Sequence, residues 1–295
     1  MATPDITIYT SPTNPDGDNN WFITGPEIEL YPDYTSDVYW QWNSSSGSWN
    51  VCSGANPTSG ASFYAPSGNN LLYYFGSGAV SGSGPVDTYT FGWDDVAPSG
   101  AIVAPSGTEY ISGDYLLQAS GEDDVSGLWK YVWRVNGKLI SEVKAPIDAV
   151  YWDTREEEDG IKILYMELID YAGNSTGDSV YIYTDNNPPY ITNEEIPTPV
   201  TSGSVAIYGD AVDAACPIDF IEYRLLKTDA DRLVEVWEEA TITSGSGTPE
   251  VAYMIPLSGL SDGDLCTLWI RGADLAGNIT SQANYLTITF PVSIL

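Results

Sequence analysis

The chain has 295 residues, 43% of them hydrophobic, a composition that favours folded domains with real cores over disorder. Its 10 Lys and Arg residues stand against 41 Asp and Glu residues, a net charge of −31 that would repel nucleic acids and anionic membranes. Histidine is absent and the three cysteines (Cys52, Cys216 and Cys266) show no C-x-x-C spacing, which argues against histidine-dependent catalysis, the usual zinc sites and a disulfide framework.

Alternating segments of β-branched and aromatic residues predict strands along the chain, separated by clusters of Gly, Ser, Asn and Pro. The clearest predicted strands are 37–43, 86–93, 161–169, 179–184, 265–273 and 285–289. No apolar run approaches the roughly 20 residues that span a bilayer, so no membrane insertion is expected. Many short strands with frequent turns predict an all-β protein of sandwiches or barrels.

Two proline-marked junctions divide the chain, DDVAPSG at 94–100 and DNNPPY at 185–190. Pro98 and Pro188 lie 90 residues apart (188 − 98), the length of a seven-stranded immunoglobulin-like sandwich. A proline after a strand ends ladder pairing and stiffens the exit from the sheet. The sequence therefore predicts three consecutive immunoglobulin-like antiparallel β-sandwiches, at 1–96, 97–188 and 189–295.

The pentapeptide Asp-x-Ala-Gly-Asn occurs twice, at 170–174 and at 274–278. Each copy follows one predicted strand and precedes the last predicted strand of its domain. We expect Gly173 and Gly277 to adopt positive φ, which is inexpensive only for glycine. The Asp170 and Asn174 side chains are expected to bond nearby backbone groups.

These residues resemble the tandem immunoglobulin-like domains of bacterial and archaeal surface proteins of the S-layer and adhesin type. Such domains end their sixth strand, F, with Asp-x-Ala-Gly-Asn and close their seventh strand, G, with Asp-Asn-x-Pro-Pro, as at 170–174, 185–189 and 274–278 here. Domain one is divergent and aromatic-rich, with a long Gly/Ser loop in place of the pentapeptide. The resemblance implies a surface-exposed, non-catalytic array.

Acidic residues are expected to gather at both junctions, because in an immunoglobulin-like chain a linker touches the B–C and F–G loops of the domain that follows it. The predicted metal ligands are Asp94, Asp95, Asp123, Asp124 and Asp170 at the first junction, and Asp185, Asn187, Asp210, Asp213 and Asp274 at the second. Gathered carboxylates repel one another unless a cation lies among them, and calcium prefers such oxygen ligands. Calcium at the interdomain junctions is therefore the predicted cofactor; the alternative is that these residues only form turns at strand ends.

Cys216 and Cys266 both fall in domain three, but at opposite ends of the predicted sandwich. Cys216 lies in the B–C loop beside the junction, and Cys266 opens strand F. A strand of about six residues separates those ends by roughly 20 Å, and Cα atoms more than about 7 Å apart cannot be bridged. We therefore expect no disulfide between them.

Domain one contains a concentration of aromatic residues, and Trp40, Trp42 and Trp49 are its candidate binding residues. Trp40 and Trp42 share one face of a predicted strand, while Tyr39 lies on the other. One aromatic set outside the core would be able to stack on sugar rings or pack against another protein. The alternative is that these residues are ordinary core aromatics.

The leading functional hypothesis is a non-catalytic, surface-exposed structural or adhesion protein, a stalk, surface-layer or appendage subunit located extracellularly or at the cell surface. Its expected partners are other protein subunits, through self-assembly or a surface partner. The C-terminal segment 284–295 closes domain three with a strand and continues after Phe290 as a five-residue apolar tail. This tail either folds back onto domain three or adds to the open sheet edge of a neighbouring chain.

Two alternatives stay open. One is a phage virion protein, a fibre or capsid decoration, since the opening residues lack the basic start and apolar stretch of a secretory leader. The other is a carbohydrate-binding accessory module of a secreted enzyme, with glycans as partners of the aromatic domain one. Without histidine or a paired nucleophile, the chain itself is not expected to be an enzyme.

Overall fold

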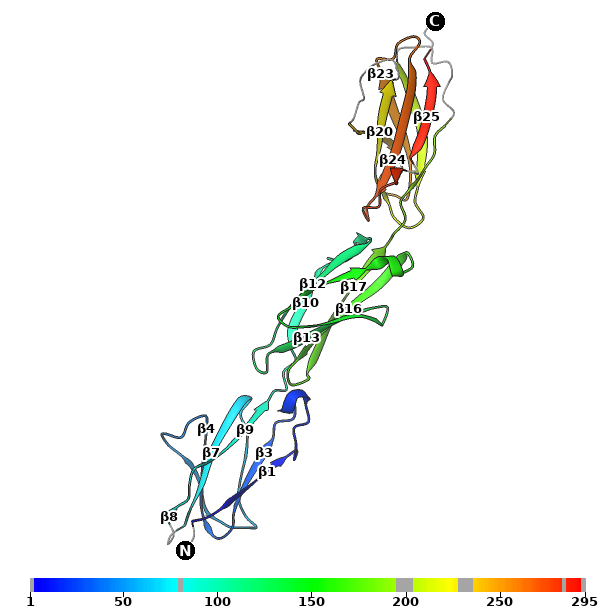
Figure 1. Cartoon of the computed structure of the whole chain (residues 1–295). Coiled ribbons are helices and arrows are strands. Elements are labelled where there is room, and N and C mark those ends of the chain that lie inside the picture. Colours follow the sequence, from blue (N-terminus) through cyan, green and yellow to red (C-terminus); the bar gives the residue numbers. More distant parts are fainter. Residues whose placement is uncertain (1–2, 79–81, 195–203, 228–235, 283–284, 293–295) are drawn as a thin grey trace. The chain divides into compact units, whose positions relative to one another are not determined.

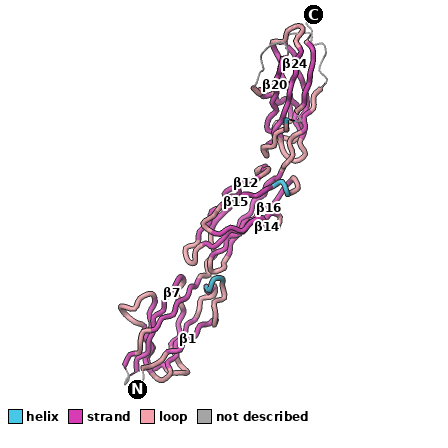
Figure 2. Tube along the Cα trace, viewed as in Figure 1, coloured by secondary structure: helices cyan, strands magenta, loops and turns pink. Residues whose placement is uncertain are grey.

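The structure, a computed structural model, describes residues 3–78, 82–194, 204–227, 236–282 and 285–292. Strands account for 62% of it and helix for 3%, which confirms the predicted all-β class (Figures 1 and 2). The chain divides into two compact units: Met1–Val103 with Gln118–Val150 and Tyr165–Ser179, and Ala104–Leu117 with Tyr151–Leu164 and Val180–Leu295. No helix in the described ranges is long and apolar enough to span a membrane.

Two sheets are built from residues 6–93. One has the order β1-β3-β6, from β1 (Ile6–Ser11), β3 (Glu27–Pro32) and β6 (Ala61–Tyr64). The other has the order β2-β9-β7-β4-β5, from β2 (Trp21–Phe22), β9 (Asp87–Trp93), β7 (Gly68–Gly78), β4 (Ser36–Trp42) and β5 (Asn50–Ala55), with β8 (Gly82–Ser83) on β7. The buried side chains of this region form one core, which includes Phe22, Ile28, Leu30, Val38 and Leu72.

Residues 99–184 repeat the same pattern of two sheets. One has the order β10-β12-β15, from β10 (Ser99–Ala104), β12 (Asp114–Glu122) and β15 (Ala149–Asp153). The other has the order β11-β17-β16-β13-β14, from β11 (Tyr110–Ile111), β17 (Ser175–Thr184), β16 (Gly160–Asp170), β13 (Leu128–Val135) and β14 (Lys138–Lys144). As β2 does with β9, the short β11 pairs in parallel with the last strand, β17.

Residues 190–291 form a further pair of sheets. One has the order β18-β19-β23-β22, from β18 (Tyr190–Ile191), β19 (Ser204–Val212), β23 (Glu250–Ser258) and β22 (Thr241–Ser244). The other has the order β21-β20-β24-β25, from β21 (Glu238–Glu239), β20 (Ile218–Lys227), β24 (Leu265–Asp274) and β25 (Leu286–Pro291). Their shared core includes Ile207, Tyr253, Ile255, Leu268 and Phe290.

The strand orders are those of immunoglobulin-like sandwiches, with strands A, B and E in one sheet and C, F and G in the other. No sheet in the described ranges joins strands from two of the predicted domains 1–96, 97–188 and 189–295. The division into two compact units, however, cuts across both sheets of residues 99–184, so that part of each sheet belongs to each unit. The three domain boundaries therefore stay a prediction.

Val292 belongs to the apolar C-terminal segment for which two outlets were predicted. Its N–H donates to the Asp264 carbonyl at 2.8 Å, and its own carbonyl accepts from the Gly263 N–H at 2.9 Å. The side chain is 3% exposed and packs in the core of residues 190–292. This residue folds back onto its own sheets; residues 293–295 of the segment lie outside the described ranges.

Candidate functional site: two acidic clusters

Three aspartates form the first acidic cluster, which we define as Asp94, Asp123 and Asp170. One carboxylate oxygen of each lies within 4.8 Å of those of the other two. Asp94 directly follows β9, Asp123 directly follows β12, and Asp170 is the last residue of β16. The whole cluster lies within the first compact unit.

The alternation of β16 explains why an aspartate is buried at its end. Leu164, Met166 and Leu168 are fully buried on one face of the strand, and Asp170 continues that face at 0% exposure. Burial raises the pKa of Asp170, and hydrogen bonds from Asn174 and Gly173 oppose that rise. A buried carboxylate needs such donors, because an unpaired one is costly.

Backbone N–H groups donate hydrogen bonds to each carboxylate of the first cluster. Asp94 accepts from the Val96 N–H at one oxygen and from the Ser126 N–H at the other, both at 2.9 Å. Asp123 accepts from the N–H groups of Val125 at 3.2 Å and Gly127 at 2.6 Å.

Asp170 is bonded by its own pentapeptide turn. One oxygen accepts from the N–H groups of Gly173 at 2.7 Å and Asn174 at 2.9 Å, and the other from the Asn174 side-chain amide at 3.0 Å. Gly173 has φ 102° and Gly277 has φ 86°, so the predicted positive φ is confirmed at both glycines. The turn thus forms because glycine permits the reversal and the aspartate caps the N–H groups that the reversal exposes.

The second acidic cluster consists of Asp185, Asp213, Asp274 and Cys216. Asp185 directly follows β17, Asp213 directly follows β19, and Asp274 is the last residue of β24. One oxygen each of Asp185 and Asp274 and the Cys216 sulfur lie within 4.8 Å of one another. Asp213 accepts from the Cys216 N–H at 2.8 Å, and its charge raises the pKa of both other aspartates. The cluster lies within the second compact unit.

Two buried carboxylate oxygens of this cluster have no hydrogen-bond partner: Oδ2 of Asp185 and Oδ2 of Asp213. The residues are 1% and 7% exposed. Their Oδ1 atoms are bonded, that of Asp185 by the Asn187 N–H at 3.2 Å and that of Asp213 by the N–H groups of Ala215 and Cys216, both at 2.8 Å. The second cluster therefore buries acceptors that the first cluster satisfies.

The pKa values of the second cluster reflect this burial. Loss of solvent raises the pKa of Asp185 to about 6, and the charges of Asp213, Asp274 and Asp159 add to the rise. Burial also raises the pKa of the Cys216 thiol to about 12. The charges that raise the pKa of Asp185 are therefore all those of carboxylates.

The two clusters are built on one hydrogen-bonded frame. The amide of Asn174 donates to the Asp94 carbonyl, and the amide of Asn278 donates to the Asp185 carbonyl, both at 2.9 Å. In each pentapeptide the residue after the aspartate donates its N–H to the B–C loop, Tyr171 to Gly127 at 2.9 Å and Leu275 to Pro217 at 3.0 Å.

The alanines of the two pentapeptides complete this frame. The Ala172 carbonyl accepts from the Asp18 N–H at 2.7 Å, and the Ala276 carbonyl accepts from the Ser112 hydroxyl at 2.8 Å. Each pentapeptide therefore forms hydrogen bonds with two parts of the preceding pair of sheets. One is the residue that follows its strand G, and the other is a loop earlier in the same pair of sheets.

Six of the ten predicted metal ligands lie in the two clusters and four do not. Asp95, Asp124 and Asp210 are exposed and belong to neither cluster. Asp210 lies within β19, where strand alternation turns its side chain to the solvent face while its carbonyl accepts from Thr192. The Asn187 amide donates instead to Asp159.

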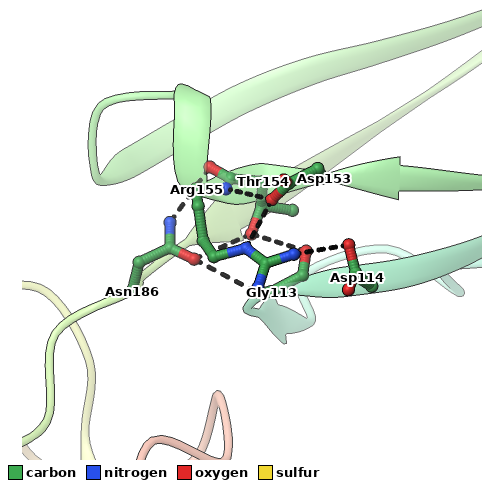
Figure 3. Close-up of polar contacts among 6 residues, drawn as sticks. All are labelled: Gly113, Asp114, Asp153, Thr154, Arg155 and Asn186. Atoms are coloured by element: carbon green, nitrogen blue, oxygen red, sulfur yellow. Dashed lines mark hydrogen bonds and ion pairs between the residues drawn. The ribbon is translucent and has the colours of Figure 1, made fainter.

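Asn186 was also expected to face the second cluster, but its side chain belongs to another network (Figure 3). Its oxygen accepts from the Gly113 N–H at 3.1 Å and the Thr154 hydroxyl at 2.9 Å, and its amide donates to the Thr154 carbonyl at 3.1 Å. In the same network Arg155 pairs with Asp114 at 2.6 Å and with Asp153 at 2.7 Å. Asn186 thus anchors the exit of β17.

Cys216 is the cluster residue that the sequence analysis did not identify as a ligand. It lies in the predicted loop, free and fully buried, as Cys266 is in the core. The available signal was its spacing: Cys216 follows Asp213 by three residues, as Ser126 follows Asp123.

Trp40 and Trp42 are not an exposed binding face, which corrects the prediction for these two residues. The Trp40 ring stacks on Phe63 with centroids 4.6 Å apart, and Trp42 meets Phe63 edge-on at 5.8 Å. Both lie on the Val38 side of β4 and pack against the core, because residues two apart on a strand share a face.

Trp49, the third candidate, lies on the opposite face of this sheet. Its ring meets Phe75 edge-on at 4.9 Å, and Tyr39 stacks on the same Phe75 at 4.9 Å. Tyr39 and Phe75 are cross-strand partners of β4 and β7, so all three side chains lie on the face away from Val38.

No protein-family model matches the chain, and no curated protein matches it. Among solved structures, the fibronectin(III)-like modules of Clostridium thermocellum CbhA are 12% identical, covering 66% of this chain and 95% of theirs, with a TM-score of 0.40. Sidekick-1 immunoglobulin domains 1–5 are 14% identical, covering 99% of this chain and 59% of theirs, with a TM-score of 0.44. A tetra-tandem repeat in the extending region of a large adhesion protein is 14% identical, covering 97% of this chain and 73% of its own, with a TM-score of 0.35.

Proposed function

We propose that this chain is a non-catalytic structural or adhesion protein built of tandem immunoglobulin-like modules, exposed at a cell surface as a stalk, surface-layer or appendage subunit. Other protein subunits are its proposed partners. The chemistry of the sequence supports this assignment, because histidine is absent and the net charge is −31. Such a surface stays soluble and repels nucleic acid.

One observation carries the proposal: the same hydrogen-bonded connection is built twice. Asn174 and Asn278 each donate to the carbonyl of the aspartate that ends the preceding strand G, Asp94 and Asp185 respectively. A polar connection repeated with the same donor, acceptor and turn serves to join successive modules. Its donor is an asparagine amide and its acceptor a backbone carbonyl, neither of which is a catalytic acid, base or nucleophile, so it suits a structural role better than a catalytic one.

Localisation tests this proposal directly. Antibodies raised against the purified chain should label intact cells of the source organism and should recover the protein from the envelope fraction. Recovery from purified phage particles instead would favour the virion alternative, a fibre or capsid decoration. Recovery from the cytosol alone would refute the surface assignment.

The carbohydrate-binding alternative loses much of its support, because Trp40 and Trp42 are half-buried and pack against the core. Trp49 remains on the other face of the sheet, beside Phe75. A glycan array on the purified chain, with Trp49→Ala as the matched variant, tests what is left of it. Binding that disappears in Trp49→Ala would revive this alternative, and absence of binding would end it.

Calcium at one interdomain junction at least is the prediction from sequence, and the hydrogen bonds of the clusters favour the second junction. In the first cluster N–H groups bond all three aspartates, so a cation there must displace existing hydrogen bonds. In the second cluster Asp185 and Asp213 each keep a buried oxygen without a partner. A divalent cation is therefore proposed at the second cluster alone.

A further inference from the structure

The second acidic cluster buries carboxylate oxygens whose loss of solvent is not compensated by hydrogen bonds. Oδ2 of Asp185 and Oδ2 of Asp213 are buried without a hydrogen-bond partner, in residues at least nine-tenths buried. Burying such an acceptor without a donor is costly, and more so when the group is charged. The nearest charges are those of other carboxylates, which add to that cost. A bound cation would remove the cost, because it pairs with the free oxygens and offsets the mutual repulsion.

The donor set of this cluster includes sulfur. The Cys216 sulfur lies within 4.8 Å of an oxygen of Asp185 and an oxygen of Asp274, and the residue is 0% exposed. Calcium takes about six to eight oxygen ligands and gains little from sulfur. Zinc takes about four ligands and accepts both thiolate sulfur and carboxylate oxygen. Asp185, Asp274 and Cys216 supply three such donors, and a water molecule can complete the four ligands of zinc.

We propose that the second acidic cluster binds a thiophilic divalent cation of the zinc class, with Cys216, Asp185 and Asp274 as its protein ligands. This inference rests on the divalent cation proposed above for this cluster, and not on the surface role of the protein. The ion would replace the thiol proton, since a metal-bound cysteine is a thiolate.

The first cluster is an internal control within the same chain. Ser126 occupies the place of Cys216, three residues after the loop aspartate, and its N–H bonds Asp94. Cys216→Ser therefore gives the second cluster the hydroxyl of the first while keeping the size of the side chain. Cys52→Ser is the matched control, because Cys52 is a half-buried thiol in β5 and outside either cluster.

The test uses the full chain after treatment with a chelator, with Co²⁺ as the spectroscopic probe and Zn²⁺ as its competitor. One equivalent of Co²⁺ should give a sulfur-to-cobalt charge-transfer band, and Zn²⁺ should abolish that band. The band should persist in Cys52→Ser and disappear in Cys216→Ser, whose zinc affinity should fall by at least about 100-fold. Circular dichroism of each variant confirms that it is folded.

Thermal unfolding provides a second measurement that does not depend on a cysteine variant. Zn²⁺ should raise the unfolding temperature of wild-type protein, and Asp185→Asn should lose most of that rise. A charge-transfer band that survives in Cys216→Ser would refute the proposal. Equal stabilisation of wild type and Cys216→Ser by Ca²⁺, without a cobalt band, would identify an oxygen-only site and also refute it. No response to any cation would also refute the proposal, and would leave the proposed surface role untouched.

Discussion

The two acidic clusters share a frame and differ in where one N–H group points. In the first, the Gly127 N–H bonds Asp123, which leaves the Ser126 N–H free to bond Asp94. In the second, proline occupies the place of Gly127, at position 217, and has no N–H to give. The Cys216 N–H bonds Asp213 instead, at 2.8 Å, and no backbone donor reaches Oδ2 of Asp185.

The residue type at this loop position therefore decides whether protein donors satisfy all the buried carboxylate oxygens of the cluster. With glycine in the loop, protein donors satisfy the carboxylates and the cluster needs nothing further. With proline, a buried acceptor is left over and the same frame needs a proton or a cation. Repeated structure does not imply repeated chemistry, because the backbone donors of a loop depend on each residue in it.

Removing one charge from each cluster tests most directly whether the two clusters differ in this way. Asp185→Asn should stabilise the metal-free protein at pH 7, because it removes a buried carboxylate whose charge is unpaired. Asp94→Asn should destabilise it by about 1–3 kcal/mol, because an amide oxygen cannot replace both acceptors of Asp94. Thermal unfolding with a chelator present measures both, and changes of the same sign would contradict the distinction between the clusters.

The pH dependence follows from the pKa of Asp185, which is raised from 3.8 to about 6. A folded-state pKa above the unfolded value means that the contribution of this group to stability is full below pH 4 and is lost as the pH rises through 6. The free energy of unfolding should therefore fall by up to about 3 kcal/mol between pH 4 and pH 7 in metal-free protein. Asp185→Asn should flatten that part of the profile, and a profile identical to wild type would show that another group titrates.

The amides of the pentapeptides should matter equally at the two clusters. Asn174→Ala and Asn278→Ala each remove two side-chain hydrogen bonds, one to the aspartate of the turn and one to the carbonyl of the preceding strand end. Each variant should lose about 1–3 kcal/mol of stability. Faster proteolysis at 94–100 in the first variant and at 185–190 in the second would locate the damage. A large effect in only one variant would mean that the two frames are not equivalent.

A smaller difference is expected at the glycines of the pentapeptides. Gly173→Ala and Gly277→Ala should each cost about 1 kcal/mol, because both positions have positive φ. A Cβ at Gly173 would also lie 3.3 Å from Asp18, whereas nothing lies within 4 Å of one at Gly277. Gly173→Ala should therefore be the more destabilising by a few tenths of a kcal/mol. The opposite order in thermal unfolding would argue against the contact with Asp18.

The smallest effect is expected from Pro217→Gly, which restores the donor that the first cluster has. The new N–H can bond Asp213, so that the Cys216 N–H becomes available to Asp185. The pKa of Asp185 should fall, and the rise in unfolding temperature caused by Zn²⁺ should shrink. An unchanged zinc response would mean that Cys216, rather than the missing N–H, controls the cation site.

Strand positions and the pentapeptide turn were predictable because they depend on local rules. Period-two alternation locates β16 and β24, and glycine at positive φ is a local requirement of the turn. Four of the six cluster aspartates, Asp94, Asp170, Asp185 and Asp274, directly follow strands that the alternation predicts. The other two, Asp123 and Asp213, follow β12 and β19, which were not among the predicted strands. Asp210 was not distinguishable from them until its place inside β19 was known.

The rest depends on three-dimensional detail that a pattern does not contain. Alternation shows that Trp40 and Tyr39 lie on opposite faces, but not which face meets the core; the buried Val38 decides that. The role of Cys216 depends on which carboxylate each loop N–H reaches. That choice is made by the φ and ψ angles around Pro217 and Gly127, and the sequence alone does not state them.

The reach of the two asparagine amides has a consequence for biosynthesis. Asn174 bonds a carbonyl 80 residues earlier in the chain, and Asn278 bonds one 93 residues earlier. At about 5–20 residues per second, a ribosome needs roughly 4–20 seconds to make the later partner. During that interval the end of each strand G lacks the amide donor that bonds it in the folded chain. The chain therefore matures in order from its N-terminus, each connection closing only when the next pentapeptide has been translated and folded.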